Sequence, residues 1–200
     1  MTLSSMPMRR RAALWIAALA TGAALLPAAA HAQANTSPRV KLATSQGDIV
    51  VELYPEKAPK TVENFLQYVR DQHYDGTVFH RVMSNFMIQG GGFTPDLQQK
   101  PTKAPIPLEA TNGLKNDRGA IAMARTSNPN SATSQFFINT VHNPSLNAPN
   151  PDGYGYTVFG KVVAGMDVVD KIRAVPVGDQ GMHQNVPKTP ITILKATLEK

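Results

Sequence analysis

One stretch of the chain sets two strong hydrogen-bonding side chains, Arg81 and Gln89, among bulky apolar residues. The apolar neighbours are Phe79, Val82, Phe86, Met87 and Ile88. Apolar walls around a few polar groups are typical of a small-ligand site. Three glycines at 90–92 also let the backbone approach another group closely. This stretch is therefore the first candidate for chemistry.

A second stretch, residues 134–139, repeats the theme of apolar bulk with an amide side chain toward each end. Residues 79–82, 86–91 and 134–138 resemble, in this order, the signature segments of cyclophilin-type peptidyl-prolyl isomerases. The resemblance extends from about residue 40 to residue 198. It implies an enzyme that accelerates cis–trans exchange at X-Pro bonds of unfolded or flexible polypeptides and needs no cofactor.

The chemistry of such an enzyme explains why an arginine stands in this setting. Rotation about an X-Pro bond is slow because amide resonance sets a barrier of ~18–20 kcal/mol. A donor to the prolyl nitrogen localises the lone pair as the bond twists, and arginine is a permanently charged, forked donor. We therefore expect Arg81 to be the catalytic residue, which the resemblance also implies. The alternative is a surface salt bridge, the common fate of an arginine.

The resemblance also places nine residues around the substrate: Phe86, Met87, Gln89, Ala124, Arg125, Gln135, Phe137, Leu146 and Tyr156. Its apolar and aromatic members match the proline pocket or its walls, and the two glutamines match side chains that hydrogen-bond the peptide backbone. Ala124 and Arg125 lie where the main chain of the family pairs with the peptide. Without the resemblance, the apolar members would more often be core residues.

Two positions depart from the familiar eukaryotic members of the family. Ser145 stands where they carry tryptophan, and Tyr156 stands where they carry histidine. Because the tryptophan position lines the groove and contributes to cyclosporin binding, we expect only weak cyclosporin binding. A tyrosine still walls a pocket and offers a hydroxyl, so we expect isomerase activity to be kept.

Other chemistries find little support. The five histidines show no metal-ligand spacing: His31, His73, His80, His142 and His183. His80 could act as a general base, but on a strand it faces away from Arg81, so a packed histidine is the better interpretation. The chain has no cysteine, which excludes disulfide and thiolate chemistry.

The charge balance gives no sign of nucleic-acid binding. The net charge is +6, and without residues 1–32 the chain keeps 17 basic and 14 acidic residues. That excess is small and scattered, which is typical of a solvated surface.

The N-terminus predicts a cleaved secretory signal at residues 1–32. Three arginines at 9–11 precede an apolar segment at 12–26 and a small-x-small cleavage site that ends at Ala32, with Ala34 as the alternative. The apolar segment is shorter than the ~20 residues of a membrane span, although an uncleaved anchor is the alternative. We expect a periplasmic or secreted protein without a stable membrane anchor, exported by the general rather than the twin-arginine route.

After a flexible lead-in at 33–39, residues 40–200 are expected to form one domain. Its expected strands are 40–43, 49–53, 77–82, 87–89, 119–124, 135–139, 156–163 and 191–198. Apolar residues recur at helical spacing only at 59–70 and 166–172. An antiparallel sandwich and a closed barrel both fit this order. The resemblance decides for a mainly β fold: a closed eight-stranded antiparallel barrel capped by two helices, with the ligand groove on its outer surface.

Three functional hypotheses follow. The first is an isomerase that acts on exported proteins as they fold, and the alternative is a non-catalytic chaperone or adaptor that holds proline-containing segments. A weaker third is that residues 143–155 form a partner-docking loop. The intact set Arg81, Phe86, Gln89 and Phe137 favours the enzyme, because a binding-only relative could lose the arginine. No oligomer signal is present, so a monomer is expected.

Overall fold

The computed structural model describes residues 37–199, so the signal-peptide prediction and residues 33–36 of the predicted lead-in lie outside the described residues. The strands are β1 (Arg39–Thr44), β2 (Gly47–Leu53), β3 (Thr77–Val78), β4 (Arg81–Met83), β5 (Met87–Gly90), β6 (Ala120–Met123), β7 (Phe136–Asn139), β8 (Val158–Ala164), β9 (Val177–Gln180), β10 (His183–Pro187) and β11 (Thr192–Leu198). The α-helices are α1 (Pro59–Arg70) and α2 (Met166–Arg173), and Pro144–Leu146 forms a 3-10 turn.

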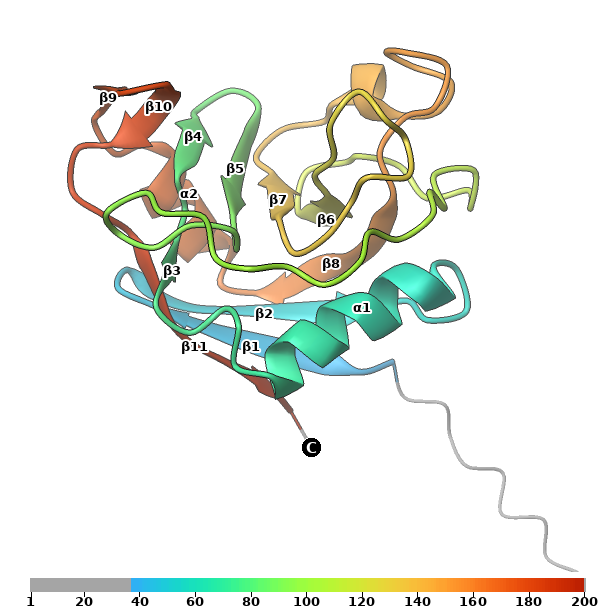
Figure 1. Cartoon of the computed structure of the whole chain (residues 1–200), viewed down its shortest axis with the longest axis horizontal. Coiled ribbons are helices and arrows are strands. Elements are labelled where there is room, and N and C mark those ends of the chain that lie inside the picture. Colours follow the sequence, from blue (N-terminus) through green and yellow to red (C-terminus); the bar gives the residue numbers. More distant parts are fainter. Residues whose placement is uncertain (1–36, 200) are drawn as a thin grey trace, which may run out of the picture. The chain divides into compact units, whose positions relative to one another are not determined.

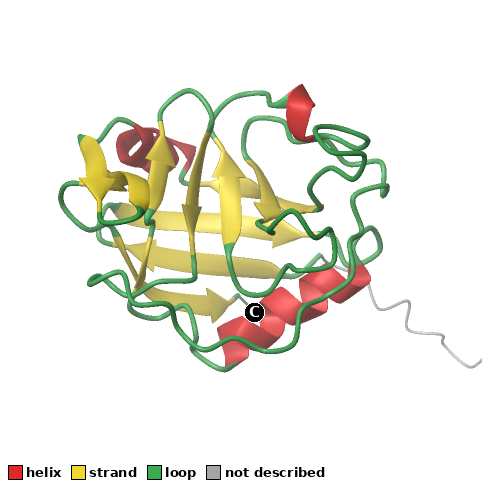
Figure 2. Cartoon of the chain, turned by 45° about the horizontal axis from the view of Figure 1, so that its top comes forward, coloured by secondary structure: helices red, strands yellow, loops and turns green. Residues whose placement is uncertain are grey.

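Nine of the strands form one antiparallel sheet in the order β3-β11-β1-β2-β8-β6-β7-β5-β4. In Figure 1, β4, β5 and β7 cross β1 and β2 at a steep angle, and Figure 2 shows the same crossing strands in yellow, so the sheet is strongly curled. The mainly β class and the two helices are thus confirmed.

The closed eight-stranded barrel is wrong. The expected strand 77–82 is two short strands, β3 paired with β11 and β4 paired with β5, and these are the two ends of the sheet. Phe79 and His80 join them outside any ladder, and the Phe79 amide donates instead to the carbonyl of Ile191, 2.9 Å away. The sheet therefore has nine strands, and its end strands are linked by the chain rather than by a ladder of hydrogen bonds.

A β-hairpin occupies residues 177–187, which lie outside all the expected strands and helices. Strands β9 and β10 pair across a turn that contains Gly181, and the pairing shifts register between His183 and Val186. Val177, Gly178, Asp179 and Gln180 show no apolar alternation, so a two-residue period could not reveal this strand.

Helix α1 covers the inside of the curl, as its apolar spacing predicts. Its buried face includes Val62, Phe65, Leu66 and Val69. No side chain next to its first turn caps it. Instead, the Glu109 carboxylate accepts hydrogen bonds from the amides of Lys60 (3.2 Å) and Thr61 (2.9 Å). None of the described helices combines the length and apolar character that a membrane crossing requires.

The strands β4 to β7 separate two hydrophobic clusters. The main core takes Val82, Ile88, Ile121, Phe136 and Ile138 together with the face of α1. The smaller cluster takes Met87, Ala120, Ala122, Phe137, Leu146 and Val158. Because alternate residues of a strand point to opposite faces, the apolar candidate site residues lie in or against the smaller cluster, and the main core is on the other face of these strands.

Candidate functional site

A row of directly opposed residues runs across four strands on the face away from the main core. Arg81 of β4 lies opposite Gln89 of β5, Gln89 lies opposite Phe137 of β7, and Phe137 lies opposite Ala122 of β6. Directly opposed residues of an antiparallel sheet share a face. The sheet register therefore brings together an arginine, an amide and an aromatic ring from distant parts of the chain.

A small cavity lies over this row. It has a volume of about 110 Å³ and is lined by Arg81, Phe86, Met87, Gln89, Ala124, Arg125, Phe137, Leu146 and Tyr156. Its volume is well below the ~300–1,000 Å³ of pockets for drug-sized ligands. The cavity therefore suits a single compact side chain, with the rest of a ligand outside it.

Arg81 differs from the other arginines of the described region. The other five each have a carboxylate partner: Arg39, Arg70, Arg118, Arg125 and Arg173. Between residues 37 and 199, the guanidinium of Arg81 has neither an ion-pair nor a hydrogen-bond partner, and its side chain is half-buried at the cavity. A salt bridge to a described residue therefore does not explain this arginine, and its donors are available to a ligand.

The apolar wall of the cavity is well packed. Met87, Phe137 and Leu146 are all buried. The Tyr156 ring meets the Phe137 ring edge-on, with the centroids 5.7 Å apart and an interplanar angle of 79°. These residues are core residues and cavity residues at once, because their side chains pack behind the surface that they present.

Of the predicted site residues, only Gln135 lies outside this cavity. Its side-chain oxygen accepts a hydrogen bond from Nε2 of Gln89 at 2.9 Å, so the two predicted glutamines are joined. Gln135 lines an adjoining cavity of about 370 Å³, whose other walls include the polar side chains of Thr102, Ser131 and Thr133. The two cavities share Gln89, Ala124 and Arg125, so a peptide could pass from one to the other.

The side chain of Arg125 is turned into the protein and is 1 % exposed. It donates to both oxygens of Asp152 (2.8 and 2.7 Å) and, through Nε and Nη2, to the carbonyl of Gly155 (3.0 and 2.8 Å). This pairing lowers the pKa of Asp152, mainly through the hydrogen bond from Arg125. Only the backbone of Arg125 remains exposed, so any contact with a ligand involves its main chain.

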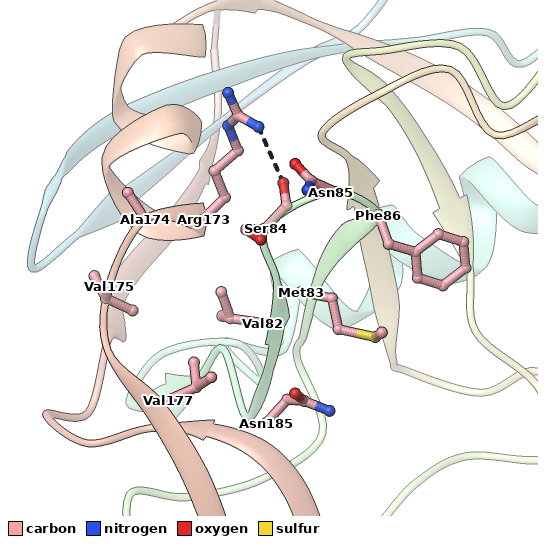
Figure 3. Close-up of a pocket in the computed structure, with 10 residues that line it drawn as sticks. All are labelled: Val82, Met83, Ser84, Asn85, Phe86, Arg173, Ala174, Val175, Val177 and Asn185. Atoms are coloured by element: carbon pink, nitrogen blue, oxygen red, sulfur yellow. Dashed lines mark hydrogen bonds between the residues drawn. The ribbon is translucent and has the colours of Figure 1, made fainter.

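A further cavity of about 440 Å³ lies beside β4 (Figure 3). Its walls include Val82, Val175 and Val177, and Arg173 closes part of it by donating to the Ser84 carbonyl at 3.0 Å. Phe86 borders both this cavity and the smaller one. Figure 3 shows the Phe86 ring pointing away from the three valines.

His80 does not reach the candidate site. It is 5 % exposed and packs against the rings of Phe93 and His183, with centroids 4.6 and 6.3 Å away. Burial, and then the charges of His183 and Arg81, lower the pKa of His80 to about 4, so it is neutral near pH 7. A packed histidine, not a general base, fits this position. In the described part of the chain, no three acidic, histidine or cysteine residues gather as a metal ion would require.

Sequence reasoning missed four residues that support the site. Asp152 fixes Arg125, and the buried amides of Asn116, Asn139 and Asn143 support the backbone on both sides of the cavity. The only signal in the sequence was the richness in asparagine of residues 139–150. That signal could not show which asparagines meet.

The comparisons with known proteins identify the family of the chain. Residues 39–198 match the model of the family described as cyclophilin type peptidyl-prolyl cis-trans isomerase. A peptidyl-prolyl cis-trans isomerase of Acinetobacter baylyi is 58 % identical over 170 residues, which are 85 % of this chain and 89 % of that protein. Peptidyl-prolyl cis-trans isomerase B of Escherichia coli is 56 % identical over 159 residues, 78 % of this chain and 97 % of that protein.

A solved structure shares the fold as well. The cyclophilin type isomerase of Cryptosporidium parvum, crystallised in the presence of the dipeptide Ala-Pro, superposes with a TM-score of 0.70 at 30 % identity. The alignment covers 81 % of this chain and 99 % of that one. With its family match, close relatives and shared fold, the chain belongs to the cyclophilin-type peptidyl-prolyl cis-trans isomerases, a family of enzymes.

Proposed function

We propose that the small cavity receives the proline ring of an X-Pro segment and that Arg81 is the catalytic residue. The observation that carries the proposal is the guanidinium of Arg81, which has no partner among residues 37–199 and lies beside a cavity with room for one compact side chain. The ring packs against Phe86, Met87, Phe137 and Leu146, while Arg81 donates to the prolyl nitrogen.

Catalysis in this arrangement depends on the twist of the bond. In the planar ground state the nitrogen lone pair is delocalised and accepts a hydrogen bond poorly. As the bond rotates, the lone pair localises, and the donation from Arg81 becomes stronger. Only an interaction that is stronger in the transition state than in the ground state accelerates the reaction. Gln89, Gln135 and the main chain at Ala124 and Arg125 hold the flanking peptide, and Tyr156 completes the wall.

The same proposal extends to where the protein works. The arginine run, apolar segment and cleavage site within residues 1–32 support export, so the substrates are exported polypeptides that fold in the periplasm or outside the cell. We propose a monomer with no nucleic-acid partner. Immunoblotting of periplasmic and cytoplasmic fractions checks the export proposal. A protein retained in the cytoplasm at its full precursor mass contradicts it.

The test of catalysis is cis–trans exchange of an Ala-Pro peptide, measured by NMR with the chain lacking residues 1–32. We expect Arg81→Ala to lower the exchange rate at least about tenfold, the loss expected for a transition-state contact worth ~1.4 kcal/mol or more. Arg70→Ala is a matched control, because Arg70 pairs with Glu63 on the surface and is 48 % exposed. Normal exchange in a folded Arg81→Ala variant contradicts the assignment, and peptide binding without faster exchange in the unmodified protein indicates a binding module.

A further inference from the structure

Three buried asparagines form a continuous chain of side-chain hydrogen bonds behind the small cavity. Nδ2 of Asn143 donates to Oδ1 of Asn139 at 2.7 Å, and Nδ2 of Asn139 donates to Oδ1 of Asn116 at 3.2 Å. All three are buried, with exposures of 6 % for Asn143, 0 % for Asn139 and 1 % for Asn116. Because the hydrogen bonds all run in one direction, from Asn143 to Asn139 to Asn116, each amide orients the next one. We call these three residues the amide relay.

The amide relay ends on the backbones of two cavity residues. At one end, Nδ2 of Asn143 also donates to the carbonyl of Phe86, at 2.8 Å. At the other end, Nδ2 of Asn116 donates to the carbonyl of Leu146, at 3.2 Å. The relay therefore connects two lining residues of the small cavity that are 60 residues apart in the sequence.

Every side-chain N–H group of the relay is used. Asn139 donates its second hydrogen to the carbonyl of Ala120 at 3.2 Å, and Asn116 donates its second to Oδ1 of Asn147 at 3.2 Å. A fully satisfied buried network specifies one arrangement, whereas a network that loses a member leaves buried polar groups unpaired. The relay thus holds the Phe86 and Leu146 backbones in one relative position.

Phe86 needs such support because its side chain borders a second cavity into which it could turn. It borders the cavity of about 440 Å³ as well as the small cavity, and it is only half-buried. In Figure 3 the Phe86 ring points away from the valines of the larger cavity, and the Met83 side chain lies between them. The segment that carries Phe86 is a turn between β4 and β5, where the Phe86 amide donates to the Met83 carbonyl at 3.1 Å. Its carbonyl is fixed by the Thr140 amide, 3.0 Å away, and by Asn143.

We propose that Asn143 is a positioning residue: through the amide relay, it keeps Phe86 at the proline cavity and out of the neighbouring larger cavity. This inference rests on the proposed function of the small cavity. Loss of the Asn143 side chain removes one of the two hydrogen bonds that fix the Phe86 carbonyl and leaves Asn139 without its donor. Phe86 is then displaced in a fraction of the molecules, and the proline ring loses its contact with the Phe86 ring there. Ground-state binding weakens, while Arg81 and the twisting bond are unaffected.

The test measures binding and turnover separately, with an Ala-Pro peptide as the probe. We expect Asn143→Ala to raise the peptide Kd in an NMR titration about fivefold, the effect of one hydrogen bond lost. The exchange rate at saturating peptide should stay within about twofold, because uniform binding affects affinity and not turnover. Asn143→Ser keeps one donor, so its Kd should lie between the values of the unmodified protein and of Asn143→Ala. It is also the milder substitution and replaces the alanine variant if that variant does not fold.

Two controls separate positioning from general loosening of the fold. Thr77→Val removes one comparable buried bond, from Oγ1 of Thr77 to the Tyr74 carbonyl at 2.6 Å, outside the relay and both peptide cavities, and should leave Kd unchanged. In a Phe86→Ala background, Asn143→Ala should add little to Kd, because the Phe86 ring is already absent. An unchanged Kd in folded Asn143 variants overturns the inference, as does an equal loss in the Phe86→Ala background or in Thr77→Val. Absence of exchange in the unmodified protein counts against the proposed function only, since Kd is measured without turnover.

Discussion

The guanidinium of Arg125 lies over the ring of Tyr156, with Cζ 4.5 Å from the ring centroid. The same guanidinium pairs with Asp152 and with the Gly155 carbonyl. One buried cation therefore contacts three residues of a single loop, Asp152, Gly155 and Tyr156. Tyr156 in turn meets Phe137 on the wall of the small cavity. A cation over an aromatic face contributes about 0.5–2 kcal/mol, more where water is excluded. Arg125 therefore fixes the wall of the cavity from behind rather than contacting a ligand with its charge.

We expect Arg125→Lys to lower the free energy of unfolding by about 1–2 kcal/mol, because an ammonium cannot replace the forked hydrogen bonds to the Asp152 carboxylate and to the carbonyls of Gly155 and Thr126, the last at 2.9 Å. Peptide affinity should fall with it, because Tyr156 loses the group that holds its face. Urea unfolding and an NMR titration with an Ala-Pro peptide measure the two effects. A stable variant with unchanged affinity shows that the Tyr156 wall does not depend on this cation.

The strands expected at 77–82 and 87–89 predict that Arg81 and Gln89 share a surface, and the family resemblance, carried by local motifs, adds Phe137. The sequence does not predict the role of the Arg125 side chain, because its partner Asp152 lies 27 residues away in a loop without periodicity. Asn116 and Asn139 are hidden for the same reason: a buried amide network depends on which loops meet, not on a repeat. The break at Phe79 and His80 turns one expected strand into two, and a period of two residues cannot detect such a break.

Phe137 lines the small cavity and is 4 % exposed. We expect Phe137→Ala to weaken binding of an Ala-Pro peptide, but burial at this level also costs about 3–5 kcal/mol of stability for Phe→Ala. Phe137→Leu is the more informative change, because it keeps most of the packing and alters the wall. Melting curves confirm that the variant folds, and a peptide titration then shows the loss. Unchanged affinity in both variants places the proline ring elsewhere.

Ser145 is exposed and precedes Leu146, which lines the small cavity. A serine there offers little apolar area to a large cyclic peptide, whereas a fully buried tryptophan contributes roughly 150–250 Å². We therefore expect weak cyclosporin inhibition of the protein and tighter inhibition of Ser145→Trp. Without cyclosporin, the exchange rate of the Ala-Pro peptide should be little changed by the substitution. Inhibition curves against cyclosporin test this. Strong inhibition of the unmodified protein contradicts the expectation, and equal curves remove Ser145 as its cause.

His80 predicts how the stability of the protein depends on pH. Burial first, then His183 and Arg81, lower its pKa from the ordinary 6.5 to about 4 in the folded state. The unfolded chain therefore binds a proton that the folded chain rejects between these two values. Stability is complete above the unfolded pKa and falls as the pH decreases through this window, by about 3 kcal/mol at 1.36 kcal/mol for each pKa unit.

The measurement is urea unfolding at pH 7 and pH 4.5 for the protein and for His80→Phe, which keeps a ring against Phe93 and cannot be protonated. We expect the variant to lose much less stability between the two pH values. Some loss should remain, because burial also lowers the pKa of His73. Asp71, Asp152 and Asp170 have lowered pKa values and act in a different range, since their contribution is lost only as the pH falls below their ordinary values near 3.8. Equal losses in both proteins show that His80 gains a proton without cost. Its Nδ1, which has no hydrogen-bond partner among the described residues, is then less buried than the packing indicates.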